Sequence, residues 1–138
     1  MNVHTLESQQ RERIPTEIFG DADEACVRLA TEIAALIRRN DAAQRPTVLG
    51  LATGSTPVRL YRQLIRLHRQ EGLSFRGVLT FNLDEYYGLP RTHPESYWRF
   101  MHDQLFDHID IPAANVHVPD GTVQIGRASC RERVCYVV

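Results

Sequence analysis

Apolar residues recur three or four positions apart in three stretches of the chain, which is the spacing of an amphipathic helix. The first stretch covers Asp21–Arg39 and opens on Asp21, a good helix N-cap. The second covers Pro57–Glu71. The third covers Thr92–His108 and opens on the Ser/Thr-x-x-Glu pattern of a capping box, Thr92 to Glu95. The pattern therefore predicts three helices.

Short apolar runs alternate with these helices. Pro46–Ala52 and Val78–Leu83 are apolar almost throughout, which is typical of strands buried on both faces of a parallel sheet. Asn115–Pro119 predicts a third, shorter strand, and Ile14–Phe19 could pair as an edge strand or simply pack. The order helix, strand, helix, strand, helix, strand predicts an α/β fold with a parallel sheet joined by right-handed crossovers.

Composition and charge exclude several classes of function. The 138-residue chain has a formal charge of -1, which gives no reason to expect a nucleic acid or a membrane surface as partner. It has no apolar run of membrane-spanning length and no secretory signal pattern, so we expect a cytoplasmic protein. All 16 basic residues are Arg, which excludes Lys-based Schiff-base chemistry and a Walker A loop. Cys26, Cys130 and Cys135 lack the spacing of a disulfide framework or a zinc site.

A small-residue turn joins the first predicted strand to the second predicted helix. Thr53, Gly54, Ser55 and Thr56 precede Pro57, which suits the first position of a helix. Free N–H groups at a helix N-terminus, hydroxyl donors and a glycine that admits close approach together favour a phosphate site. The alternative is an ordinary turn in which Ser or Thr caps the helix, and the local sequence leaves it open. A dinucleotide-binding Gly pattern is absent.

Two acidic residues, Asp84 and Glu85, follow the second predicted strand. In a parallel sheet ligands bind beyond the carboxyl ends of the strands, so both acids are expected near the proposed phosphate. A carboxylate in this position is a natural general base, because partial burial is expected to raise its pKa toward the working pH. We expect only one of the pair to serve chemically, with the other capping the loop or lying in solvent, and the sequence does not decide which.

Four stretches together, "VLGLATGSTP", "TFNLDEYYGL", "HPESYWRFM" and "FDHIDIPAANVHVPDG", resemble the N-terminal half of the glucosamine-6-phosphate deaminase family over about Ile14–Thr122. The resemblance implies a modified Rossmann-like parallel sheet with flanking helices, here truncated. It implies conversion of glucosamine 6-phosphate and water to fructose 6-phosphate and ammonia, without a redox cofactor or a catalytic metal. By resemblance Asp84 moves a proton between C2 and C1, residues 53–56 hold the phosphate, and Glu85 is a candidate second acid.

Two other functions are compatible with the same fold. The 6-phosphogluconolactonases share the phosphate turn, but their acidic motif typically reads "DER" where this chain reads "DEY", which favours the deaminase. A sugar-phosphate-binding regulator would keep the phosphate loop and lose the catalytic acid, and Asp84 is present. The family resemblance also implies a homo-oligomer for the full-length protein and a small-molecule substrate as its partner.

The chain divides into three parts on these grounds. Residues 1–13 are expected to be a loose N-terminal segment, and residues 14–123 the N-terminal half of the deaminase domain. Residues 124–138, ending "IGRASCRERVCYVV", resemble the translation of a sequencing adapter and are expected to be non-native, a basic interaction tail being the alternative. The residues that the family uses for ring opening and amine departure lie further along, so the 138-residue chain alone is expected to be inactive.

Overall fold

A computed structural model describes residues 16–123 of the chain, and the predicted alternation of helices and strands is confirmed there. The tail that was predicted to be non-native and residues 1–13 lie outside the described residues. The elements in chain order are α1 (Ala22–Ala42), β1 (Thr47–Leu51), α2 (Val58–Glu71), β2 (Val78–Asn82), α3 (Tyr97–Gln104), the short 3-10 helices η1 (Phe106–His108) and η2 (Ala113–Asn115), and β3 (Val116–His117). None of the helices within 16–123 is long and apolar enough to cross a membrane.

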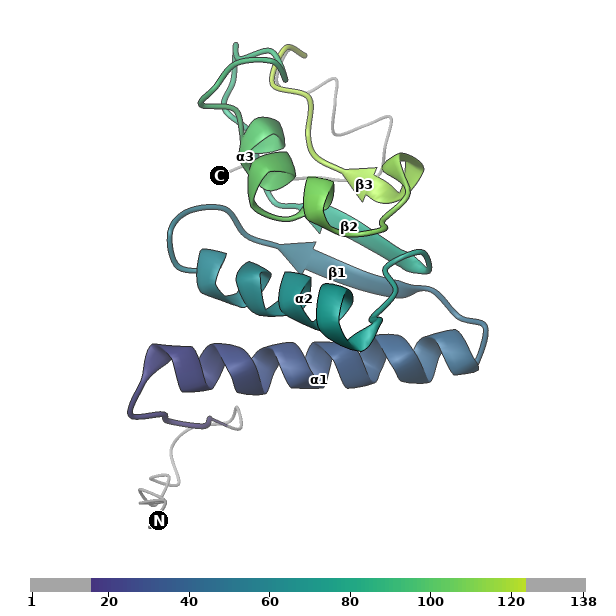
Figure 1. Cartoon of the computed structure of the whole chain (residues 1–138). Helices are drawn as coiled ribbons and strands as arrows, with labels where there is room; N and C mark the ends of the chain where they lie inside the picture. Colours follow the sequence, from purple (N-terminus) through teal and green to yellow (C-terminus); the bar gives the residue numbers. More distant parts are fainter. Residues whose placement is uncertain (1–15, 124–138) are drawn as a thin grey trace.

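The strands form one parallel sheet in the order β1-β2-β3, as predicted. Pairing of β1 with β2 runs from Thr47 opposite Val78 to Leu51 opposite Asn82, and Thr80 pairs with Val116 of β3. All three arrows in Figure 1 point the same way, with α2 lying between α1 and the strands. Because the strand order moves in one direction, right-handed crossovers place α2 and α3 on the same face of the sheet.

The core lies between this helix layer and one face of the sheet. Helix α2 contributes Tyr61, Leu64 and Leu67, one turn apart, and α1 contributes small residues that let the two helices approach closely. The fully or nearly buried apolar side chains are Ala30, Ala34, Ile37, Leu51, Tyr61, Leu64, Leu67, Leu73, Phe75, Val78, Met101, Leu105, Phe106 and Val118.

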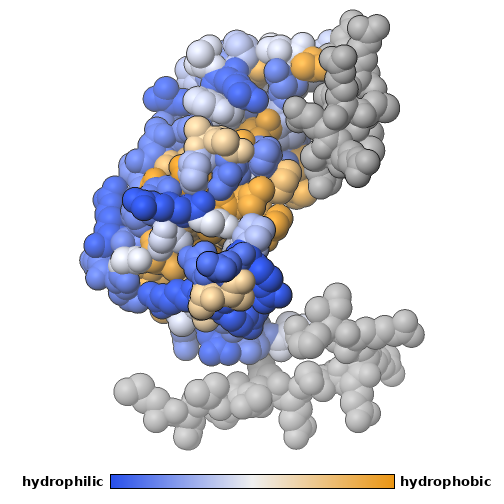
Figure 2. Space-filling view, turned by 90° about the vertical axis from the view of Figure 1, so that its right-hand side faces the viewer, coloured by the Kyte–Doolittle hydropathy of each residue, from blue (hydrophilic) through white to orange (hydrophobic). Residues whose placement is uncertain are grey.

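The opposite face of β1 is open, so the prediction that this strand is buried on both faces is wrong. Thr47 and Leu51 are buried, but Val48 is 61% exposed and Gly50 is also exposed. The physical reason is the one-sided helix layer, because within residues 16–123 the helices cover only the face that Thr47 and Leu51 share. Figure 2 shows apolar residues at the surface across the middle of the molecule, at the height of the sheet in Figure 1.

Three predicted boundaries also differ from the structure. The described part of the Ile14–Phe19 run, Thr16–Phe19, forms no strand, and Ile18 is exposed rather than packed, because no strand edge lies beside it to pair with. Helix α1 continues past Arg39 to Ala42, where the Ala43 amide bonds back to the carbonyl of Arg39 at 3.2 Å. The third strand is shorter than Asn115–Pro119 and consists of Val116–His117.

The predicted capping box at Thr92–Glu95 is wrong, because the chain forms turns there before the helix begins. The amide of His93 donates to the carbonyl of Pro90 at 2.9 Å, and that of Ser96 to the carbonyl of His93 at 3.0 Å. Ser96 is the actual N-cap of α3, and its hydroxyl accepts from the Arg99 amide at 3.1 Å. The helix then stops at Gln104, before His108, and η1 completes the segment as a tighter turn.

Asp110 ties the segment before β3 to the loop before β2. Its carboxylate accepts from the Phe75 amide at 2.6 Å and from the Ser74 hydroxyl at 2.9 Å, with His68 Nδ1 at 3.7 Å and Arg76 Nε at 3.4 Å. Partial burial opposes ionisation, but these hydrogen bonds and the His68 charge outweigh it and hold the pKa of Asp110 below its ordinary value. The charged carboxylate therefore stabilises the fold.

We predict that Asp110→Ala lowers the free energy of unfolding by about 1–3 kcal/mol at pH 7, because the Phe75 amide loses its acceptor. A carboxylate with a depressed folded-state pKa gives its full stabilisation above its unfolded pKa of about 4 and loses it as the pH falls through the folded value. Urea unfolding from pH 7 to 2 should therefore show the difference from the unmodified chain shrinking below about pH 4. Equal stability of the two proteins at pH 7 would contradict this role, and Asp103→Asn, on an exposed face of α3, is the control.

Candidate functional site at the carboxyl edge of the sheet

The two segments that the sequence singled out begin side by side. Leu51 and Asn82 form the last pair of the β1–β2 ladder. Beyond this pair the strands separate, and the side-chain amide of Asn82 donates to the Leu51 carbonyl at 3.0 Å. Residues 53–56 follow β1 and residues 84–85 follow β2, so both segments leave the same edge of the sheet, as predicted. Parallel α/β sheets bind ligands beyond this edge, outside the carboxyl ends of their strands.

The loop after β1 is anchored at its start and exposed at its tip. The hydroxyl of Tyr61, which is buried in α2, donates to the Ala52 carbonyl, and burial raises the pKa of Tyr61 to about 12, so it remains a donor. Gly54 has φ +98°, a conformation that residues with a Cβ rarely adopt. Ser55 and Thr56 are exposed, and their hydroxyls make no hydrogen bond to any residue in the described part of the chain.

Helix α2 leaves its N-terminus uncapped. Its N-cap is Pro57, which supplies no side-chain hydrogen bond, and the first turn contains no acidic residue. By contrast, the Asp21 carboxylate caps α1 and the Ser96 hydroxyl caps α3. Among the three α-helices within residues 16–123, α2 alone therefore has no side chain that binds its first N–H groups. This arrangement favours an anion site over the alternative of a turn capped by Ser or Thr.

Glu85 has a positioning role in this structure. Its Oε1 accepts from the amides of Tyr86 at 2.9 Å and Tyr97 at 2.8 Å, and its Oε2 accepts from the Trp98 amide at 2.9 Å. A carboxylate that binds the first amides of α3 stabilises the helix N-terminus and fixes the loop that carries Glu85. Of the two acids, Glu85 is thus the one that caps.

Asp84 makes none of the hydrogen bonds that Glu85 makes. Its side chain is exposed, so the expected partial burial is wrong for Asp84, because the loop turns away from the sheet after Asn82. It makes no hydrogen bond or ion pair with the residues that the structure describes. A carboxylate that is free of structural partners, on a fixed loop at the carboxyl edge, is available to a ligand. Asp84 is therefore the acid that the geometry favours as a general base.

The segment after β3 also holds the loop that carries Asp84 and Glu85. The amide of Gly88 donates to the Gly121 carbonyl at 2.7 Å. A Cβ on Gly121 would lie 2.3 Å from the Tyr86 carbonyl oxygen and 2.8 Å from that of Leu89, so no side chain fits. Gly121 is buried beneath the loop. The segment after β3 thus packs directly against the backbone that presents Asp84.

Sequence reasoning missed three residues that build this edge. The helical spacing places Tyr61 on the buried face of α2 but does not show that its hydroxyl also fixes the end of β1. Gly121 could have been singled out only as the Gly of "VPDG". Asn82 carried the clearest signal, a polar residue that ends an apolar strand. Its Oδ1 is buried and has no partner among the described residues.

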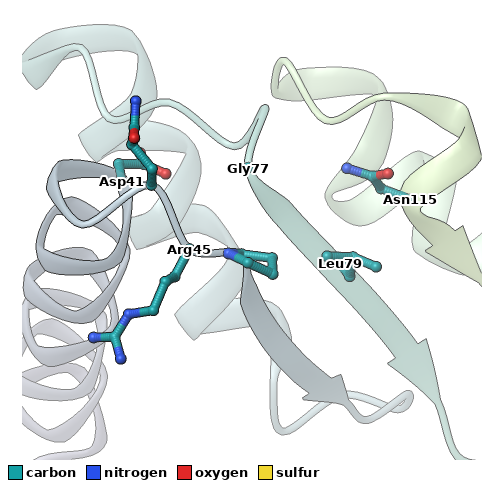
Figure 3. Close-up of a pocket in the computed structure, with 7 residues that line it drawn as sticks. Asp41, Arg45, Gly77, Leu79 and Asn115 are labelled. Carbon is teal, nitrogen blue, oxygen red and sulfur yellow. The ribbon is translucent and has the colours of Figure 1, made fainter.

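A separate cavity lies at the opposite edge, where the strands begin. It has a volume of about 290 Å³ and contains none of the predicted site residues. Figure 3 shows Asp41 and Arg45, from the end of α1 and the turn after it, on one side and Asn115 on the other. The cavity is lined by Asp41, Gln44, Arg45, Pro46, Gly77, Leu79 and Asn115. Within residues 16–123 no group of three His, Cys, Asp or Glu side chains is placed to hold a metal ion.

Comparisons with known proteins agree with the fold. The sequence model of the family described as glucosamine-6-phosphate isomerases/6-phosphogluconolactonase matches residues 20–133, and the chain belongs to this family. The glucosamine-6-phosphate deaminases of Yersinia pseudotuberculosis and Yersinia pestis are 52% identical to it over 89 residues, which is 64% of this chain and 34% of each relative. The chain thus spans about a third of the length of these curated relatives.

Solved structures of two kinds resemble the chain. A monomeric glucosamine-6-phosphate deaminase superposes with a TM-score of 0.73 at 42% identity, covering 80% of this chain and 44% of that one. A 6-phosphogluconolactonase from Thermotoga maritima superposes with a TM-score of 0.63 at 26% identity, covering 81% of this chain and 47% of that one. Both confirm the predicted Rossmann-like parallel fold of partial length.

We predict that Glu85→Gln lowers the free energy of unfolding by about 1–2 kcal/mol, because a neutral amide bonds the first amides of α3 less strongly than a carboxylate. Urea unfolding gives the stability, and hydrogen exchange at the Tyr97 and Trp98 amides should accelerate. The matched control is Glu95→Gln, an exposed Glu beside the same helix, with an expected change within about 0.5 kcal/mol. Unchanged exchange at both amides in Glu85→Gln would refute the capping role.

Proposed function

We propose that this chain carries the phosphate loop and the general base of a glucosamine-6-phosphate deaminase, an enzyme that converts glucosamine 6-phosphate and water to fructose 6-phosphate and ammonia. The observation that carries the proposal is Asp84, a carboxylate without structural partners among the described residues, at the same edge of the sheet as the uncapped N-terminus of α2. The 52% identity to curated deaminases supports the choice of reaction within the family.

In the proposed mechanism the loop after β1 holds the phosphate. Free N–H groups at the start of α2 and the hydroxyls of Thr53, Ser55 and Thr56 are the donors for its oxygens. A fixed phosphate positions the open-chain sugar so that C1 and C2 lie over Asp84. The Asp84 carboxylate removes the proton from C2 and returns it to C1, while a proton from the nitrogen passes to the aldehyde oxygen, which turns the 2-amino aldose into the 2-imine of fructose 6-phosphate. Water then adds to the imine carbon, and the nitrogen leaves as ammonia, which gives the ketose.

Lactone hydrolysis is the second candidate function. The Thermotoga maritima 6-phosphogluconolactonase shares the fold with a TM-score of 0.63. Its 26% identity is lower than the 42% of the structurally similar deaminase. A regulator without catalysis has less support, because a binding protein has no need of the unpartnered Asp84 on a fixed loop.

The chain spans only part of the deaminases that it matches, and this limits what the 138 residues can do on their own. The match covers 34% of each curated deaminase, and the family's further catalytic groups lie beyond it by resemblance. We therefore propose that the chain alone does not turn over glucosamine 6-phosphate. Homo-oligomerisation of the longer protein stays a prediction, and one structural relative is described as monomeric.

We predict that Asp84→Asn lowers kcat for ammonia release by roughly 10²-fold or more while substrate binding is kept, because the variant loses the base without changing shape. The assay uses a longer enzyme in which residues 1–123 are joined to the remaining part of the Yersinia pseudotuberculosis deaminase. Asp103→Asn, which removes an exposed Asp charge on α3, is the matched control with an expected kcat within about twofold of the unmodified enzyme. Near-normal kcat in Asp84→Asn would remove the catalytic assignment.

In the same enzyme, Ser55→Ala should act on binding rather than on chemistry. It removes one donor to the phosphate dianion, so we expect a loss of about 1–3 kcal/mol, seen chiefly as a raised KM. Steady-state ammonia release against glucosamine 6-phosphate concentration separates KM from kcat. Ser74→Ala, a hydroxyl in the loop before β2, is the control. A lower kcat with unchanged KM in Ser55→Ala would argue against a phosphate contact.

A further inference from the structure

Large apolar side chains are exposed immediately around Asp84. Leu83 is 55%, Tyr86 51% and Tyr87 62% exposed, and they are three of the eight exposed large hydrophobic side chains within residues 16–123. The other five are spread over α1, β1 and the two ends of the described chain. Aromatic rings that carry a hydroxyl offer an apolar face and a polar tip, which is the combination that a polyhydroxylated ligand contacts.

These tyrosines lie on a loop that is already fixed. Glu85 binds the first amides of α3, and the Gly88 amide binds the Gly121 carbonyl, so the residues on both sides of Tyr86 are anchored. The Tyr86 carbonyl also lies so close to Gly121 that no Cβ would fit there. An exposed ring held in this way has lost its backbone freedom before a ligand arrives, which lowers the entropic cost of binding.

Tyr86 and Tyr97 form a hydroxyl pair. Their oxygens are 3.0 Å apart, and their ring centroids lie 4.6 Å apart at 39°. One hydrogen bond between two hydroxyls uses one hydrogen and leaves the other uncommitted, and neither hydroxyl bonds a further residue within the described range. The bond to Tyr97 also raises the pKa of Tyr86, with a smaller contribution from the Asp84 charge. The pair thus remains a neutral donor close to the carboxylate.

We propose that Tyr86 contacts the sugar portion of the substrate, and that Tyr97 is the residue that positions it. The Tyr86 ring packs against the carbon chain, and the uncommitted hydroxyl hydrogen of the pair donates to a sugar oxygen held over Asp84. This inference rests on the proposed function, because it uses the same site. It adds a residue that contacts the sugar. The loop of residues 53–56 does not do so, because in the proposed mechanism that loop binds only the phosphate.

The test compares the binding of two ligands, inorganic phosphate and glucosamine 6-phosphate, to the 138-residue chain. The binding is measured by NMR titration. The unmodified chain should bind the sugar phosphate at least about tenfold more tightly than phosphate, roughly the value of one net hydrogen bond. Tyr86→Phe, which keeps the ring and removes the hydroxyl, should lower this preference about five- to tenfold without changing the Kd for phosphate. Tyr97→Phe should change the preference in the same direction, whereas Tyr87→Phe, which removes a similarly exposed hydroxyl that is not paired with Tyr97, should change it less than twofold.

The outcomes separate the two proposals. Phosphate binding that shifts the Gly54 and Ser55 amides, combined with an unchanged ligand preference in Tyr86→Phe, would overturn the role of Tyr86 and leave the phosphate site standing. Absence of binding by both ligands would remove the proposed function and this inference together. If the chemical shifts of the Gly88 and Tyr97 amides are the same in Tyr86→Phe as in the unmodified chain, the loop is intact. A weaker preference for glucosamine 6-phosphate over phosphate is then due to the missing hydroxyl.

Discussion

The parallel pairing of β1 with β2 is the constraint on which the rest of this structure depends. It brings the carboxyl ends of the two strands to one edge, where Leu51 lies opposite Asn82. The Asn82 amide continues the contact by binding the Leu51 carbonyl where the backbone ladder ends. With antiparallel pairing, the loop of residues 53–56 and the loop that carries Asp84 would leave opposite edges and could not serve one ligand. Side-chain hydrogen bonds from Tyr61 and Glu85 then fix the two loops to α2 and α3 respectively.

The site combines loops that are anchored by hydrogen bonds with a few polar groups that have no hydrogen-bond partner within residues 16–123. The capping residues of α1 and α3 are satisfied within the chain, whereas the N-terminus of α2, the Ser55 and Thr56 hydroxyls and the Asp84 carboxylate have no partners among residues 16–123. Unpaired polar groups gathered at one edge of a sheet lower stability unless solvent or a ligand satisfies them. These groups lie at the carboxyl edge of the sheet, where the proposed function places the sugar phosphate.

Much of this could be predicted from the sequence, because hydrophobic periodicity and end signals are local. Helix α2 and the turn at Gly54 followed from the spacing of Leu64 and Leu67 and from the small residues before Pro57. The start of α3 was predictable only in part: its N-cap Ser96 is local, but the carboxylate that binds the Tyr97 amide belongs to Glu85, more than ten residues away, and only the folded chain brings them together. The division of roles between Asp84 and Glu85 was undecidable for the same reason. The open face of β1 depends on where the helices pack, which the composition of a short apolar run does not determine.

The choice between deamination and lactone hydrolysis is the central claim, and one comparison tests it most directly. Residues 1–123 joined to the remaining part of the Yersinia pseudotuberculosis deaminase would be assayed in parallel for ammonia release from glucosamine 6-phosphate and for hydrolysis of 6-phosphogluconolactone. We expect ammonia release that depends on Asp84, and lactone hydrolysis no faster than the uncatalysed rate. Lactone hydrolysis without ammonia release would contradict it.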